Sequence, residues 1–151
     1  RGVRPVDRNV RILLAPRLGA ALLAALVAVP AAAAPTLYDR LGGEPAMTRI
    51  ARALIERTAT FHQTARSFAD TDLDQISTSL AVQLCDLTGG PCTYAGDSMR
   101  DVHAGHGITQ SELYGMVELL EDVLREQGIG LREKNELLAL LAPMKRDVVE
   151  R

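Results

Sequence analysis

Two of the three histidines in this chain, His103 and His106, lie three residues apart in the stretch DSMRDVHAGHGIT. Met99 and Val102 precede His103 at helical spacing, whereas glycines flank His106 on both sides. A neutral imidazole can bind a metal through one ring nitrogen. The alternative is a histidine packed in an apolar core, and the residues alone leave both open for His103. For His106, and for His62 in a polar corner, we expect solvent exposure.

The two cysteines, Cys85 and Cys92, are separated by six residues. In an exported chain an even pair of cysteines usually forms a disulfide, which in so short a loop contributes on the order of 2–3 kcal/mol. The alternative is a metal site that combines both cysteines with His103 and His106. Their C-x6-C and H-x2-H spacing is not that of a structural zinc site. In the oxidising compartment of an exported chain, the cysteines would also tend to form a disulfide and not to remain thiolate ligands. The sequence therefore favours the disulfide.

The first 34 residues differ in composition from the rest of the chain. They contain five arginines and one aspartate, an uninterrupted apolar run from Leu18 to Val29, and then alanines in an A-x-A arrangement. This pattern is typical of a secretory signal peptide, cleaved after Ala33 or Ala34. A membrane anchor would need roughly 20 apolar residues, and this run is shorter. We therefore expect an exported, periplasmic protein without a stable membrane anchor after cleavage.

Residues 35–151 form the predicted folded domain. They carry 12 basic and 18 acidic residues, a net charge of −6. An acidic domain without a basic stripe is not expected to bind nucleic acid. Aromatic residues make up only 3% of the chain and tryptophan is absent, whereas strands are enriched in aromatic and β-branched residues. The composition therefore predicts an all-α domain.

Helix signals divide the first half of this domain. A short helix over 36–43 ends at two glycines, and a longer helix follows over 44–61. Asp72 is the predicted N-cap of a third helix, after a corner that carries Phe68. A loop over 88–96, rich in glycine and proline, ends the third helix. The apolar residues of the third helix recur at steps of three and four: Leu73, Ile76, Leu80, Leu84 and Leu87.

Three further helices are predicted after the loop. A short one begins near Asp97 and carries His103. Thr109 and Glu112 form a capping box at the start of the next helix. The last helix covers 131–149 and is bent or ended at Pro143. The apolar residues expected on the last two helices are Leu113, Val117, Leu120 and Leu124, then Leu131, Leu137, Leu138 and Leu141.

Common catalytic motifs are missing from the sequence. The glycine pairs at 42–43 and 89–90 follow no predicted strand and precede no G-K-[ST], so they do not form a phosphate-binding loop. No serine lies in a G-x-S-x-G motif. With three histidines and no paired-carboxylate pattern, the sequence does not indicate a hydrolase.

The motifs taken together resemble those of the group I truncated haemoglobins, the two-over-two helical globins. LYDRLGG, the Phe68 corner, TGGPCTYAG, M-x-x-V-H-A-G-x-G-I-T and the closing LLAPM occur in the order and spacing of that family. The match covers nearly all of residues 37–149. The resemblance implies a truncated two-over-two globin fold over residues 35–151, with haem b (iron protoporphyrin IX) as the cofactor.

The resemblance also implies roles for residues around the haem. His103 matches the proximal histidine that bonds the iron, and Phe68 matches the phenylalanine that packs on the haem. Tyr94 and His106 match positions near the haem propionates. The residues implied to line the proximal side and floor of the pocket are Met99, Val102, Ile108, Leu113 and Met116.

The predicted distal pocket departs from the pattern of many family members. Where those carry a tyrosine and a glutamine or another polar group that donates hydrogen bonds to bound oxygen, this chain has Ile55, Ile76 and Leu80, with Leu84 beside them. Losing such donors weakens oxygen binding by roughly 1–3 kcal/mol, about tenfold to a hundredfold. Ser79 stands where some relatives place an iron-binding histidine, so six-coordination by that route is not expected.

Carbon monoxide and nitric oxide depend less on hydrogen-bond donors than oxygen does. We therefore expect poor oxygen storage and fast oxidation to the ferric state. The side chains that could restore polarity by turning inward are Ser77, Thr78 and Gln83.

The function indicated by the resemblance is binding of a diatomic gas (O2, NO or CO) or redox chemistry with a periplasmic electron-transfer partner. We expect a carrier or sensor rather than an enzyme, because nitric oxide dioxygenation needs a stable ferrous–oxygen complex. Weak peroxidase activity is common to exposed haems, so it would not identify the function of this protein. Two alternatives stay open: a haem-free globin-fold domain that binds a partner or an apolar ligand, and a Cys/His metal protein.

Overall fold

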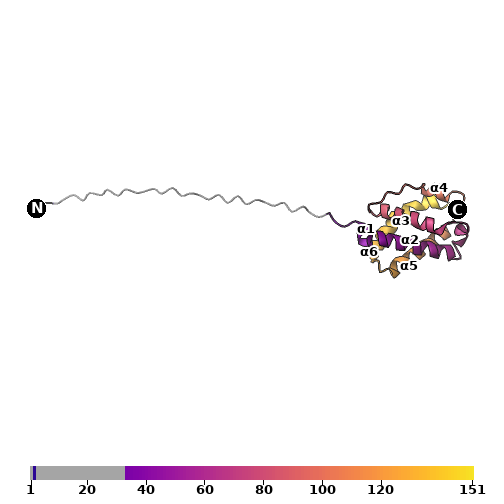
Figure 1. The fold of residues 1–151 in the computed structure, drawn as a ribbon, viewed down its shortest axis with the longest axis horizontal. Helices are drawn as coiled ribbons and strands as arrows, with labels where there is room; N and C mark the ends of the chain where they lie inside the picture. Colours follow the sequence, from indigo (N-terminus) through magenta and orange to yellow (C-terminus); the bar gives the residue numbers. More distant parts are fainter. Residues whose placement is uncertain (1, 3–32) are drawn as a thin grey trace. The chain divides into compact units, whose positions relative to one another are not determined.

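The computed structural model describes residue 2 and residues 33–151, so nearly all of the predicted signal peptide lies outside the described residues. Residues 33–151 contain no strand, which confirms the all-α prediction, and none of their helices is long and apolar enough to cross a membrane. The helices (Figure 1) are α1 (Leu37–Leu41), α2 (Gly43–Thr60), α3 (Leu73–Leu87), α4 (Met99–His103), α5 (Gln110–Glu126), α6 (Leu131–Leu141) and α7 (Lys145–Val148), with 3₁₀ turns η1 (Ala65–Phe68) and η2 (Ala142–Met144).

Side-chain caps set where several helices begin. The Asp72 carboxylate accepts a hydrogen bond from the Gln75 N–H at the start of α3, and Thr109 and Glu112 form a capping box at the start of α5. Both caps were predicted from the sequence, and they satisfy N–H groups that have no partner within the helix. The prediction that Gly42 and Gly43 both end the first helix is only half correct. Gly42 (φ +106°) ends α1, whereas α2 already begins at Gly43.

The hydrophobic core lies where α2 packs against α3 and α5 and where α1 packs against α6. Its fully buried side chains include Ile50 of α2, Leu84 of α3, Leu124 of α5 and Leu137 of α6. The apolar face predicted for α5 is buried only in its second half, since Leu120 and Leu124 are buried but Leu113 and Val117 are half-buried.

Leu131, which we grouped with the apolar residues of the last helix, is 69% exposed. It is the first residue of α6, and its side chain lies outside the contacts that bury Leu137. Helical spacing alone does not reveal where a helix leaves the core.

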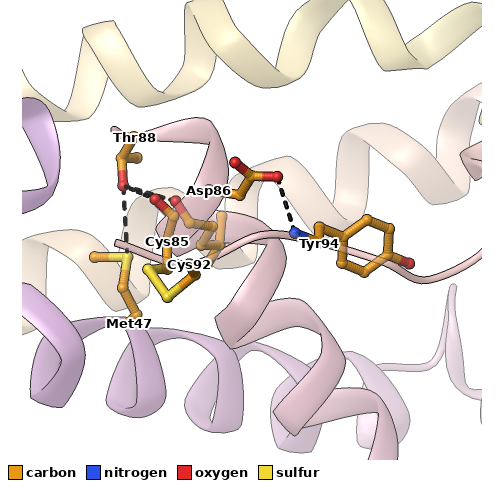
Figure 2. Close-up of a disulfide and its surroundings, with 7 residues drawn as sticks. Met47, Cys85, Asp86, Thr88, Cys92 and Tyr94 are labelled. Atoms are coloured by element: carbon orange, nitrogen blue, oxygen red, sulfur yellow. Dashed lines mark hydrogen bonds between the residues drawn. A yellow bond between two sulfur atoms is a disulfide. The ribbon is translucent and has the colours of Figure 1, made fainter. Parts of the chain in front are cut away.

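The predicted disulfide between Cys85 and Cys92 is present and joins the end of α3 to the following loop. Figure 2 shows Thr88 beside it, with its hydroxyl donating to backbone carbonyls of α3, including Leu84 at 2.7 Å. The Thr88 carbonyl accepts a hydrogen bond from the Tyr38 N–H of α1 at 2.9 Å. The disulfide therefore braces a segment that also connects α3 to α1.

Removing the disulfide should reduce stability without changing the fold. For the double substitution Cys85→Ala and Cys92→Ala we expect the unfolding free energy to fall by about 2–3 kcal/mol, because the short loop is then unconstrained in the unfolded chain. Denaturant unfolding measures this change. A reducing agent should lower the stability of the wild type to that of the variant and leave the variant unaffected. Equal stability of wild type and variant under oxidising conditions contradicts the prediction.

Candidate functional site

His103 is the last residue of α4 and is half-buried. Its ring Nδ1 lies 2.7 Å from the backbone carbonyl oxygen of Met99, one helical turn earlier. A carbonyl oxygen only accepts hydrogen bonds, so Nδ1 carries the hydrogen and donates it. The lone pair of the neutral ring is then on Nε2. In proteins, metal-binding histidines are commonly oriented by such a bond from the other ring nitrogen.

Contacts from outside the helix hold α4 in place, because a helix of five residues is not stable alone. Ser98 caps its start by accepting from the Asp101 N–H. Arg100 forms an ion pair with Asp147 of α7 at 2.5 Å, and α4 packs against α7. The orientation of His103 therefore depends on both the cap and α7.

A cleft of about 370 Å3 lies between the end of α3, the loop after the disulfide and the start of α4. Among its lining residues are Gln83 and Leu87 of α3, Tyr94 of the loop, Met99 of α4 and Met144. The Gln83 side-chain amide donates to the Met99 sulfur at 3.4 Å, which connects α3 to α4. The structure thus brings together two of the predicted cofactor residues, Met99 and Tyr94.

Tyr94 has a fixed position at this cleft. Its backbone N–H donates to the Asp86 carboxylate at 3.0 Å (Figure 2), and its hydroxyl donates to the Asp97 carbonyl at 3.2 Å. These contacts are compatible with the predicted place of Tyr94 at the polar edge of a ligand pocket.

The other residues predicted on the proximal side differ in exposure. Ile108 is buried, whereas Val102 is 41% exposed. His106 and His62 are both exposed, as predicted. Phe68, Leu113 and Met116 are half-buried on η1 and α5. Their contact with a haem stays a prediction.

The residues predicted for the distal pocket lie on α2 and α3. Ile55 and Leu84 are each only 2% exposed, but Leu84 belongs to the main core and Ile55 is buried outside it. Ile76 and Leu80 are half-buried. An assignment of all four to one pocket stays a prediction.

The polar side chains that could have entered this pocket have partners elsewhere. The Ser77 hydroxyl donates to the Leu73 carbonyl at 2.7 Å, and the Thr78 hydroxyl donates to the Asp74 carbonyl at 2.9 Å. Both bonds return to α3 itself. The aliphatic character predicted for this side of α3 is therefore not offset by these two hydroxyls.

A second, wider hollow of about 430 Å3 is lined by Gln63, Gln110, Tyr114 and Glu118, among others. None of the predicted haem residues lines it. Its lining is polar, which fits a surface depression better than a site for an apolar cofactor.

The capping-box pattern predicted Thr109 as a partner of Glu112, but the sequence did not indicate the second partner of this carboxylate, which is only 7% exposed. Its Oε2 accepts from the Arg66 guanidinium at 2.6 Å and from the N–H and hydroxyl of Thr109, both at 2.8 Å. Burial acts most strongly and raises the pKa of Glu112, but the hydrogen bonds from Arg66 and Thr109 together hold it below its ordinary value of 4.5. The capping-box pattern identified Glu112, whereas no local pattern marks Arg66, which lies 46 residues away.

The alternative of a Cys/His metal site is contradicted by the structure. Cys85 and Cys92 are joined in a disulfide, so neither supplies a thiolate ligand. Among the described residues, no three His, Cys, Asp or Glu side chains are grouped so that they could hold a metal ion.

Comparison with known proteins gives consistent matches over the described domain. Residues 36–150 match the model of the family described as bacterial-like globin. The chain is 28% identical over 116 residues to the group 1 truncated haemoglobin GlbN of Nostoc sp. (strain MUN 8820), covering 77% of this chain and 98% of the relative. It is 26% identical over 113 residues to GlbN of Mycolicibacterium paratuberculosis, covering 75% of this chain and 83% of the relative.

Solved structures show the same similarity. The crystal structure of the truncated haemoglobin from Tetrahymena pyriformis in its Fe(III) form superposes with a TM-score of 0.73 at 26% identity. The match covers 78% of this chain and all of that chain. The structure of Chlamydomonas reinhardtii THB1 superposes with a TM-score of 0.64 at 26% identity, covering 80% of this chain.

The Glu112 carboxylate should make stability depend on acid. Because its folded-state pKa is lowered, its contribution is full above its ordinary pKa and is lost as pH falls through the lowered value. We expect Glu112→Gln to lower the unfolding free energy by about 1–3 kcal/mol at neutral pH, since a charged hydrogen-bond acceptor is lost. The difference from wild type should shrink as the pH falls below the ordinary value of 4.5 and through the lowered pKa. Denaturant unfolding across this range measures it.

Glu118→Gln is the matched control, because Glu118 is an exposed carboxylate of the same helix. It should follow the wild-type curve at every pH. A Glu112→Gln curve that runs parallel to wild type throughout the acid range below pH 4.5 would contradict this account of the acid dependence.

Proposed function

Because the chain belongs to the bacterial-like globin family, with the two-over-two helical fold of the group I truncated haemoglobins, we propose that it binds haem through Nε2 of His103. The observation that carries the proposal is the hydrogen bond from His103 Nδ1 to the Met99 carbonyl. It sets the tautomer that an axial ligand to iron requires. His106 and His62 are exposed side chains and are not proposed as ligands.

The side chains proposed to contact the haem suit a flat, mostly apolar cofactor with a polar edge. Phe68, Met99 and Leu113 are large apolar side chains that remain half-buried, and covering them with an apolar ligand is favourable. Tyr94 and His106 are proposed at the propionate edge. Held there, a haem would supply an iron with one position open to a small ligand.

The proposed cofactor is haem b, bound without a covalent link to the protein. Covalent c-type attachment requires cysteine thiols, usually in a C-x-x-C-H motif. The two cysteines of this chain are joined in a disulfide, and neither lies in such a motif. Retention of the cofactor would therefore depend on the bond from His103 and on apolar burial.

The proposed ligands are diatomic gases, with weak discrimination in favour of oxygen. Ile55, Ile76 and Leu80 offer no hydrogen-bond donor, and the Ser77 and Thr78 hydroxyls are engaged within α3. Bound oxygen carries partial negative charge and gains most from donors. This supports ready binding of carbon monoxide and nitric oxide, weak oxygen storage and a carrier, sensor or redox role.

The proposed compartment is the periplasm, with an electron-transfer partner there if the role is redox. The support is the apolar run from Leu18 to Val29 with its basic flank. The disulfide between Cys85 and Cys92 is consistent with an oxidising compartment.

Absorption spectroscopy of the purified protein titrated with haem tests the proposal. We expect a Soret band that saturates at one haem per chain and shifts on reduction and on addition of carbon monoxide. His103→Ala should lose or alter this spectrum, because the nitrogen bonded to iron is removed.

The matched control is His62→Ala, which removes an exposed histidine outside the proposed haem contacts and should leave the spectrum of the complex intact. No saturable Soret band in the wild type would overturn haem binding and leave a haem-free globin-fold domain. An unchanged spectrum in His103→Ala would overturn the choice of ligand.

A further inference from the structure

The turn that follows His103 has little rigidity of its own. α4 ends at His103, and Ala104 is extended (φ −59°, ψ 127°). Gly105 (φ +81°) and Gly107 (φ +60°) both adopt left-handed backbone conformations, which favour glycine. Glycine also loses the most conformational freedom on ordering. The turn has one backbone hydrogen bond of its own, from the His106 N–H to the His103 carbonyl at 3.2 Å. Its other restraints come from other parts of the chain.

The carboxylate of Glu150 binds the turn from one side. Its Oε1 accepts from the Gly105 N–H at 2.7 Å, and its Oε2 accepts from the Gly107 N–H. These two bonds lower the pKa of Glu150, and bonds to a charged acceptor are stronger than neutral ones. The backbone N–H of Glu150 also donates to the Ile108 carbonyl at 2.9 Å. This backbone bond thus keeps the Glu150 carboxylate beside the turn.

The guanidinium of Arg66 binds the same turn through its carbonyl groups. Nη1 donates to the His106 carbonyl at 3.1 Å, and Nη2 donates to the Gly107 carbonyl at 3.0 Å. The same Nη2 donates to Glu112 at 2.6 Å, which connects the turn to the start of α5. A planar guanidinium with several donors in fixed directions suits such a junction. Arg66 comes from η1, 40 residues before His106.

We propose that Arg66 and Glu150 are positioning residues for His103: by holding the N–H and carbonyl groups of the 104–107 turn, they keep its imidazole aligned for iron. The inference rests on the proposed haem binding by His103. Both residues act through the backbone and hydrogen-bond to the segment that begins immediately after His103.

Two observations separate this role from general support of the fold. Arg66 and Glu150 are exposed and lie outside the hydrophobic core. In addition, α4 keeps its own anchors, the Ser98 cap and the ion pair of Arg100 with Asp147. Loss of Arg66 or Glu150 should therefore increase the freedom of the turn and of His103 while the helical core stays formed.

The experiment compares Glu150→Gln and Arg66→Gln with two matched controls, Glu118→Gln and Arg49→Gln, which change exposed residues of α5 and α2. Each purified protein is loaded with haem. Two properties of the complex are measured: the rate of haem transfer to an excess of a haem-scavenging apoprotein, and the iron–histidine stretching band of the ferrous form by resonance Raman. The unfolding free energy of the haem-free protein is measured in parallel.

We expect Glu150→Gln and Arg66→Gln to release haem about tenfold faster than wild type, because charge-assisted hydrogen bonds are lost. Their iron–histidine band should shift or broaden, whereas both controls match the wild type. The increase in the haem-release rate of the double variant should be smaller than the product of the two single-variant increases, because both residues hold the same turn.

Unchanged release rates and bands in both variants overturn the inference, as does a loss of apoprotein stability with an unchanged band. If Glu150→Gln does not fold, Arg66→Gln decides alone. Failure of both to fold assigns the contacts to folding and overturns the positioning role. A wild type that forms no haem complex overturns the proposed function and this inference together, an outcome distinct from a bound wild type with unaffected variants.

Discussion

The hydrogen bond from His103 Nδ1 to the Met99 carbonyl, at 2.7 Å, determines which ring nitrogen faces outward with a lone pair. It forms within α4, so it depends on five residues keeping helical geometry. A helix of that length is unstable alone. The chemistry proposed for His103 therefore depends on every contact that keeps α4 folded and oriented.

Those contacts differ in kind from the ones that stabilise the rest of the domain. The core of α1, α2, α5 and α6, with the end of α3, is apolar and is braced by the disulfide. The surroundings of α4 are polar: the Ser98 cap, the Arg100–Asp147 ion pair, and the contacts of Arg66 and Glu150 with the following turn. Stability and histidine geometry thus rest largely on separate sets of interactions. Arg66 is shared between them, because its guanidinium also pairs with the buried Glu112 carboxylate.

Local chemistry explains which features were predictable from the sequence. The caps at Asp72 and Thr109 involve residues three apart, and the disulfide partners are seven apart. By contrast, Arg66 and Glu150 reach the turn after His103 from about 40 residues away on either side, and no periodicity encodes such contacts. The role of His103 could not be derived from its spacing, because a packed core histidine shows the same pattern; it required the family resemblance.

The tautomer of His103 tests the account most directly. In the haem-free protein labelled with 15N-histidine, two-bond 1H–15N spectra at about pH 8, where histidines are mostly neutral, distinguish a protonated ring nitrogen from an unprotonated one. We predict that His103 is held with hydrogen on Nδ1 and a lone pair on Nε2, while the exposed His62 and His106 average between tautomers. A His103 ring with hydrogen on Nε2, or one that averages like the other two, would contradict the account.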